Sequence, residues 1–178
     1  IYAFWQQSVR LKNERAEAAL ATAQGAFYSG NTTLAKSDLE KLVGRYPGTA
    51  GSTQAGLLLG QIMYGEGKYD DGIGSLTSLL GSAPSQFKSS IEELIAAGYA
   101  DSNRAADAAE HFMKAAALAP FAADEQMYQA DAARMYRAAG KVDEARAIWA
   151  ELVKIPDSPV MTEAKVRMGE IDAKVATP

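Results

Sequence analysis

An internal repeat constrains this chain more than any other feature. Four turn sequences begin at Gly30, Gly67, Asn103 and Gly140, which lie 37, 36 and 37 residues apart. A small residue follows five positions later in each, and a proline comes eleven or twelve positions after that. A helix that ends and turns back needs a left-handed backbone position, which glycine and asparagine tolerate, and proline cannot continue a helix. The period therefore predicts a series of helical hairpins.

Between these marks the apolar residues follow the helical spacing i, i+3 and i+4, as in Leu39, Leu42 and Val43. No segment alternates with period two over the length of a strand, so the sequence predicts an all-α chain. The small residues Ala35, Gly72, Ala108 and Ala145 are expected where paired helices approach closely. Trp149, on a second helix, is predicted to be buried between helices.

Several units resemble the tetratricopeptide repeat, whose pattern places small and aromatic residues at fixed positions and ends in proline. In the third unit these positions are occupied by Ile95, Ala96, Tyr99, Ala108, Phe112 and Pro120. The fourth unit has Ala132, Ala133, Tyr136, Ala145, Trp149 and Pro156, and the leading tryptophan of the pattern is absent from every unit. The resemblance implies a right-handed α–α solenoid of about four hairpins.

We expect a single solenoid domain over residues 1–178, with units at about 16–52, 53–88, 89–125 and 126–159. The first helix is expected to be longer than the others. Met161, Ala164, Met168, Ile171 and Val175 step by three and four residues, which predicts a capping helix over 160–176 with one apolar stripe.

The composition excludes several kinds of chemistry. The chain has no cysteine and one histidine, His111, so zinc sites and nucleophile–histidine catalysis lack their parts. The adjacent Glu92 and Glu93, in a first helix, are the remaining candidates for acid–base work, but two neighbouring carboxylates there are a weak sign of it. We therefore expect no enzyme activity, no catalytic residue, no metal and no cofactor. A formal net charge of -4 disfavours binding to nucleic acid.

The resemblance implies a protein or peptide partner, held on a concave face that the first helices of the hairpins line. Transferring the inner positions of the family residue by residue predicts a partner-binding set in all four units. Its members are Leu20, Gln24, Phe27, Tyr28, Gln54, Leu57, Gln61, Tyr64, Glu93, Ala97, Asp101, Met127, Ala130, Arg134 and Arg137.

This set has two interpretations. Arg134 and Arg137 would make one end of the groove basic and suited to an acidic peptide end. Alternatively, Phe27, Leu57 and Met127 only pack between neighbouring units.

The repeat style is similar to that of bacterial extracytoplasmic tetratricopeptide proteins of the cell-division coordinator, outer-membrane assembly lipoprotein and translocon-ancillary types. That similarity implies a periplasmic scaffold or adaptor, with a cytoplasmic location as the alternative. Tyr2, Phe4 and Trp5 precede Arg10 and Lys12, an order typical of the stretch beside a membrane helix, which predicts a membrane tether upstream of residue 1. A second hypothesis is homo-oligomerisation through the terminal helices.

Overall fold

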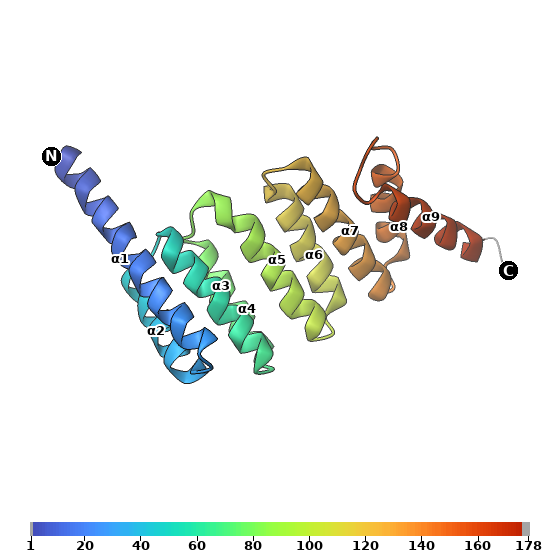
Figure 1. The fold of residues 1–178 in the computed structure, drawn as a ribbon. Helices are drawn as coiled ribbons and strands as arrows, with labels where there is room; N and C mark the ends of the chain where they lie inside the picture. The colour runs from blue at the N-terminus through green and yellow to red at the C-terminus, as the bar shows by residue number, and fades with distance from the viewer. Residues whose placement is uncertain (1, 176–178) are drawn as a thin grey trace. The chain divides into compact units, whose positions relative to one another are not determined.

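The computed structural model describes residues 2–175, and these residues form helices joined by short turns (Figure 1). The described helices are α1 (Tyr2–Tyr28), α2 (Thr32–Arg45), α3 (Ala50–Gly65), α4 (Tyr69–Leu80), α5 (Ser85–Asp101), α6 (Ala105–Leu118), α7 (Ala122–Ala138), α8 (Val142–Leu152) and α9 (Met161–Val175). The prediction of an all-α fold is confirmed.

Two compact units make up the chain, and the boundary between them falls inside α5. In unit 1, Ile1–Leu94, α1 packs on α2 and α3, α2 packs on α3, and α3 packs on α4. In unit 2, Ile95–Pro178, α6 packs on α7, α7 on α8, and α8 on α9. Helices that are adjacent in sequence therefore pair within each unit, as the repeat predicted.

The four repeat turns have the backbone that their residues predicted. The φ angles of Gly30, Gly67 and Gly140 are 84°, 75° and 78°, and that of Asn103 is 61°. In these turns a backbone N–H just beyond the first helix of the hairpin donates to a carbonyl in its last turn, as Lys68 N does to Met63 O at 2.9 Å. The left-handed residue closes the first helix and reverses the chain so that the second helix can pack against it.

The small repeat residues mark close helix contacts, again as predicted. Ala35, Ala108 and Ala145 are fully buried. A Cβ added to Gly72 would lie 2.5 Å from Cε1 of Tyr64 on the paired helix. Gly51 of α3 faces the backbone of α1, where an added Cβ would lie 2.9 Å from the carbonyl carbon of Ala16. These contacts let paired helices approach more closely than larger side chains would allow.

The core of unit 1 is aliphatic and lies among its first three helices. It consists of Leu20, Ala23, Leu39, Leu42, Ala55, Leu59 and Ile62. Burial of a leucine of this kind contributes roughly 1.5–3 kcal/mol.

The core of unit 2 is built around Trp149 of α8, which is 0% exposed. Ala130 and Ala133 of α7 and Ala164 and Ile171 of α9 belong to the same core. The apolar stripe of the capping helix is confirmed over its described side chains, and the side chain of Val175 lies outside them. The predicted burial of Trp149 is confirmed.

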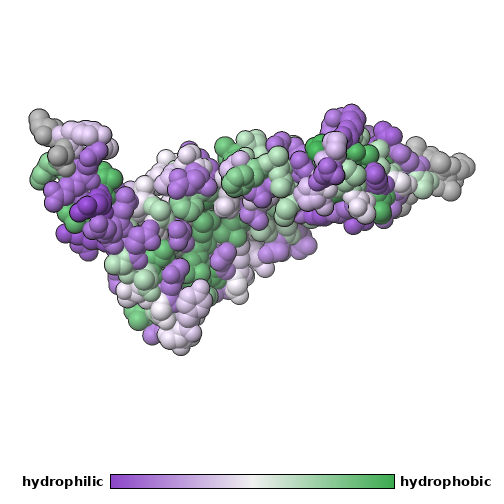
Figure 2. Space-filling view, turned by 45° about the horizontal axis from the view of Figure 1, so that its top comes forward, coloured by the Kyte–Doolittle hydropathy of each residue, from purple (hydrophilic) through white to green (hydrophobic). Residues whose placement is uncertain are grey.

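Hydrophobic residues are unevenly distributed over the surface. In the view of Figure 2 they gather in the first half of the chain beyond its N-terminal end, whereas that end is mostly hydrophilic and the C-terminal part shows both kinds of residue. Among the described residues, none of the helices combines the length and the apolar character that crossing a bilayer requires.

Candidate functional site

A hollow of about 340 Å³ lies in unit 1 where the end of α1 meets α3. Phe27 of α1 and Gln61 of α3, both in the predicted partner-binding set, line it. The other lining residues are Thr32, Leu58, Ile62, Gly65 and Glu66, and most of the exposed lining is apolar. We call this hollow the Phe27 pocket.

Local sequence determines where these side chains lie. Gly30 ends α1 just beyond Phe27, and the Leu34 amide donates to the Asn31 side chain at 3.2 Å, which caps the N-terminus of α2. Phe27 packs on the core of unit 1 and also contacts the ring of Tyr28 edge-on, with centroids 5.7 Å apart. The aromatic wall of the pocket is therefore anchored to the core on one side and open on the other.

Opposite Phe27, α3 supplies the second wall. Leu58, Gln61, Ile62 and Gly65 follow the spacing i, i+3, i+4 and i+7, so they share one face of α3. Sequence reasoning placed only Gln61 of these four in the partner-binding set. That spacing was visible in the sequence, and it would have added Leu58 and Gly65 to the set.

A charged group borders the apolar walls. Glu66 accepts hydrogen bonds from Lys36 Nζ at 2.8 and 2.7 Å and forms an ion pair with Lys68 at 2.9 Å. The hydrogen bond from Lys36, followed by that from Lys68, lowers the pKa of the Glu66 carboxyl below its ordinary value. The same contact raises the pKa of the Lys68 ammonium. The pocket therefore has apolar walls and a charged edge, which suits an apolar side chain that carries polar neighbours.

The structure brings several predicted residues together on one surface. Apart from Tyr64, six of the predicted residues lie on α1 and α3, two helices that contact each other, and have side chains that are at least partly exposed; we call them the α1–α3 face. They are Gln24, Phe27, Tyr28, Gln54, Leu57 and Gln61. Tyr28 is 81% exposed, which leaves a large aromatic surface open to solvent beside the pocket.

Other predicted residues of the set lie elsewhere. Leu20 and Ala130 are buried in the two cores, so they support the helices from within and have no surface to offer a partner. Tyr64 turns toward α4, where its ring lies 5.8 Å from that of Tyr69. Met127 is exposed on α7.

The third predicted unit is interrupted by the boundary between the compact units. Glu93 lies in unit 1, whereas Ala97 and Asp101 lie in unit 2. All three are on α5, where Glu93 and Asp101 are exposed.

In unit 2 the predicted basic residues are engaged by α9. Arg134 donates from Nε to Glu163 at 2.9 Å and makes a second contact to the same carboxylate, and it also contacts Asp131. Arg137 Nη1 lies 2.5 Å from Glu170. Arg167 of α9 bridges Glu163 and Glu170 at 3.4 and 3.2 Å. The acidic side chains of the capping helix thus occupy the positions that an acidic peptide end was expected to take.

The carboxyl groups respond to this network in two ways. Hydrogen bonds from Arg134 lower the pKa of Glu163, and hydrogen bonds from Arg137 lower the pKa of Glu170. Burial raises the pKa of the Asp131 carboxyl, although Arg134 acts in the opposite direction. A hollow of about 410 Å³ borders Arg134, Arg137, Arg167 and Trp149, but its guanidinium groups are matched by these three carboxylates.

The groups considered for catalysis are separated or used structurally. Glu92 is buried and Glu93 is exposed, so the two carboxyl groups do not share one environment. The His111 ring stacks on Tyr99 with centroids 5.1 Å apart, and the Arg104 guanidinium lies 4.6 Å from the centroid of the Tyr99 ring. No group of three or more His, Asp or Glu residues within the described part of the chain could hold a metal ion.

Comparison with family models identifies the family to which this arrangement of hairpins belongs. Residues 5–130 match the model of the tetratricopeptide repeat-like domain, and residues 131–158 match that of the tetratricopeptide repeat. The chain belongs to the tetratricopeptide repeat-like family. No curated protein matches the sequence of this tetratricopeptide chain.

Two solved structures share the fold. One is a variant of the nearly identical TPR-like repeats of a putative kinesin light chain from Podosopora anserina, with a TM-score of 0.64 and 15% identity over 93% of this chain and 89% of that one. A second structure of those repeats has a TM-score of 0.61 and 15% identity over 93% of this chain and 99% of that one. At this identity the likeness establishes the tetratricopeptide solenoid fold alone. Domains with this fold bind protein partners and are typically non-catalytic.

Proposed function

We propose that the chain is a non-catalytic adaptor that holds a peptide or a partner domain on the α1–α3 face. The observation that carries this proposal is the Phe27 pocket, an apolar hollow beside an exposed aromatic ring. Buried aromatic anchors in well-packed pockets supply most of the energy in protein interfaces. Gln61, which lines the pocket, and Gln24 and Gln54 on the same two helices have amides that offer both donors and acceptors to a peptide backbone.

The direct test is affinity capture with the full-length protein from its own cells, with partners identified by mass spectrometry. Phe27→Ala removes one wall of the pocket, and Gln61→Arg fills the pocket from an exposed position without touching the core. Both variants should lose the partner that the unaltered protein recovers. Gln86→Arg, an exposed change on α5, is the matched control and should keep it.

The result that would overturn this function is retention of the same partner by Gln61→Arg at unchanged yield. Phe27→Ala alone cannot decide, because Phe27 also packs on the core. Circular dichroism of each variant separates lost binding from lost folding.

We further propose that the protein acts in the bacterial envelope, anchored to a membrane and facing the periplasm. The support is the repeat style, which is similar to that of envelope adaptors, together with the exposed aromatic residues at the start of α1. Fractionation of cells that make the full-length protein, followed by protease treatment of spheroplasts, tests this location. Recovery in the soluble cytoplasmic fraction would support the alternative.

Self-association is the second candidate function. Tyr2, Trp5 and Val9 are exposed and continue, at helical spacing, the face of α1 that Ala16 and Leu20 bury lower in the helix. A second copy could cover this stripe. Sedimentation velocity of the purified chain at high concentration decides between the two, because a monomer contradicts self-association and leaves the adaptor function intact.

A further inference from the structure

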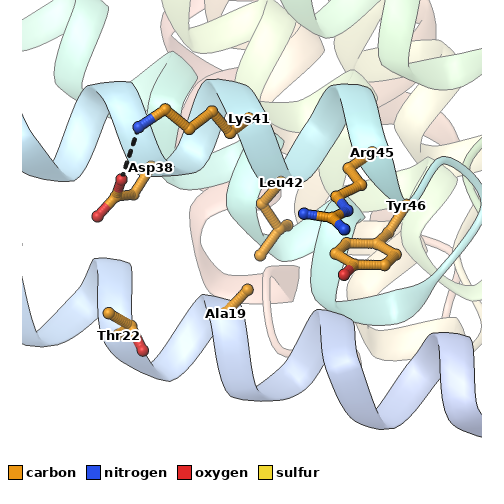
Figure 3. Close-up of a pocket in the computed structure, with 7 residues that line it drawn as sticks. All are labelled: Ala19, Thr22, Asp38, Lys41, Leu42, Arg45 and Tyr46. Carbon is orange, nitrogen blue, oxygen red and sulfur yellow. Dashed lines mark hydrogen bonds and ion pairs between the residues drawn. The ribbon is translucent and has the colours of Figure 1, made fainter.

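A second groove of unit 1 differs in character from the Phe27 pocket. It lies between α1 and α2, has a volume of about 300 Å³, and is lined by Ala19, Thr22, Asp38, Lys41, Leu42, Arg45 and Tyr46 (Figure 3). Figure 3 shows Leu42 and Ala19 between two polar ends, with Lys41 and Asp38 at one and Arg45 and Tyr46 at the other. We call it the α1–α2 groove.

Cations outnumber carboxylates in this groove. Lys41 contacts Asp38 at 3.3 Å with its own side chain 72% exposed, so the pair is loose and open to solvent. The Arg45 guanidinium lies 5.6 Å from the centroid of the Tyr46 ring and has no acidic partner among the described residues. An arginine stacked on an aromatic ring keeps its N–H edge available for an oxyanion.

Helix α1 adds two more cations at the Tyr46 end. Lys12 and Arg15 share one face of α1 with Ala19 and Thr22, because the four follow the spacing i, i+3, i+7 and i+10. Lys12 Nζ donates to the Pro47 carbonyl at 2.6 Å, which places its ammonium group beside the groove with two N–H bonds to spare.

The acidic residues of these helices lie mostly away from the groove. Glu14 is paired with Arg10 at 3.3 Å, and helical spacing puts Glu14 and Glu17 on the other side of α1. Glu40 lines a different hollow, with Lys36 and Glu66. A chain with a net charge of -4 thus carries a local basic site with four cations and one carboxylate.

The aromatic end of α1 extends this surface. Figure 1 shows α1 reaching beyond the end of α2 at its N-terminus. Phe4 and Trp5 on this extension are 79% and 61% exposed, and the rings of Tyr2 and Trp5 stack with centroids 6.3 Å apart. Trp5 shares a helix face with Lys12, seven positions along, which corresponds to about 10 Å of helix.

We propose that the aromatic end of α1 and the α1–α2 groove together dock onto an anionic bilayer surface, with the groove holding a lipid phosphate group. Tryptophan, tyrosine and phenylalanine enter the interfacial layer of a membrane, while lysine and arginine beside them contact anionic headgroups. The separation between Trp5 and Lys12 is comparable to the thickness of one headgroup layer, about 5–8 Å. Arginine beside lysine is well suited to a phosphate, which accepts several hydrogen bonds.

This docking surface goes beyond the adaptor function, and it rests on the proposed membrane-side location. A bilayer accounts for both halves of the surface at once. An acidic peptide would explain the cations, but it would leave three exposed aromatic rings on the adjoining helix without a partner.

The test is co-sedimentation of the purified chain with vesicles of phosphatidylcholine alone and with vesicles of phosphatidylcholine and phosphatidylglycerol in equal parts. We expect binding to the anionic vesicles only, and a steep loss of binding as salt is added. Lys41→Gln with Arg45→Gln should weaken that binding about thirty-fold, because each cation at a charged surface contributes about a factor of five. Lys114→Gln with Lys165→Gln, which removes two exposed cations from α6 and α9, is the matched control and should bind like the unaltered chain.

A second readout follows the aromatic end. Trp149→Phe leaves Trp5 as the sole tryptophan, so its fluorescence should shift to shorter wavelength on anionic vesicles and stay unchanged on neutral ones. Excess inorganic phosphate in solution should compete only as its ionic strength predicts, because the aromatic contacts need a bilayer.

Three results would overturn the proposal. They are equal binding to neutral and anionic vesicles, no binding to either, and full binding by the Lys41→Gln, Arg45→Gln variant. A fourth contrary result would be a stable dimer in sedimentation velocity without vesicles that is lost in Trp5→Ala, because a second copy would then occupy the aromatic surface. Because fractionation of cells tests the location separately, failure here with a membrane-bound full-length protein refutes the docking surface alone.

Discussion

The first-helix surfaces of the two units differ in what covers them. In unit 1, Phe27 and Gln61 line a hollow that is open to solvent. In unit 2, Arg134 and Arg137 of α7 are held by Glu163 and Glu170 of α9. Equivalent repeat positions therefore have different availability, because a capping helix follows one hairpin and covers its charged face. Binding positions inferred from the repeat pattern are therefore available to a partner only where no terminal helix packs over them.

The largest expected effect concerns the core that holds α9 in place. Trp149→Ala should destabilise unit 2 by about 3–5 kcal/mol, because a fully buried ring is replaced by a cavity. Trp149→Phe should cost much less, since it keeps a ring and removes an indole N–H that is buried without an acceptor among the described residues. Urea unfolding followed by circular dichroism measures both. Equal stability of the alanine variant and the unaltered chain would show that α8 does not organise this unit.

The next effect concerns the helix contact that builds the α1–α3 face. Gly51→Ala should destabilise unit 1 by about 1–3 kcal/mol, because the new methyl group meets the α1 backbone at Ala16 rather than a flexible side chain. Gly74→Ala, where nothing lies within 4 Å, is the control and should stabilise the same unit by about 0.5–1 kcal/mol. Thermal unfolding compares the pair. A neutral Gly51→Ala change would mean that α1 and α3 can separate, and the Phe27 pocket would then not be preformed.

A smaller effect is expected from the ion pairs that cover the α7 face. Arg134→Gln with Arg137→Gln should lower the stability of unit 2 only slightly, since partly exposed ion pairs contribute little to the free energy of unfolding. Hydrogen exchange should accelerate in α9 and remain unchanged in α3. If exchange in α9 does not change, the apolar stripe alone fixes the capping helix, and the charges do not distinguish the two units.

The smallest expected effect is a pH dependence of the ion pairs between α7 and α9. The pKa values of Glu163 and Glu170 are lower in the folded chain than in the unfolded chain. Their contribution to the stability of the folded state is therefore present at pH values above the pKa of the unfolded chain, and it is lost as the pH falls through the pKa of the folded chain. The pKa of the Asp131 carboxyl is raised in the folded chain, so ionisation of this group at higher pH disfavours the folded state, opposite to the effect of the two glutamates. We expect the protection factors of the α9 amides, which are corrected for the intrinsic pH dependence of exchange, to fall in acid below the ordinary glutamate value of 4.5. Glu163→Gln with Glu170→Gln should abolish this acid-dependent loss of protection, and persistence of the full pH dependence in that variant would contradict the assignment.

The fold could be predicted from the sequence because the residues that define each hairpin are close to one another in the chain. A left-handed turn residue, a small residue five positions later and a proline each have one physical reason, and the structure confirms the turns at Gly30, Gly67, Asn103 and Gly140. The burial of Trp149 followed from its position on a second helix.

The candidate site was only partly predictable, since it depends on contacts distant in sequence. Gln61 was placed in the partner-binding set, and helical spacing alone could have added Leu58, but Glu66 could not be placed there because the pocket needs the end of α1 beside it. Likewise, the residues near Arg134 in the sequence do not predict its hydrogen bond to Glu163, which lies 29 residues away. Pairings of this kind depend on how the helices pack.

Site-specific photo-crosslinking in native cells tests the central comparison most directly. One full-length protein would carry a photoreactive residue at Gln61, in the Phe27 pocket, and another would carry it at Ala138, beside the arginines that α9 covers. The account predicts an adduct with a second protein from position 61 and none from position 138. An adduct from position 138 with none from position 61 would contradict it.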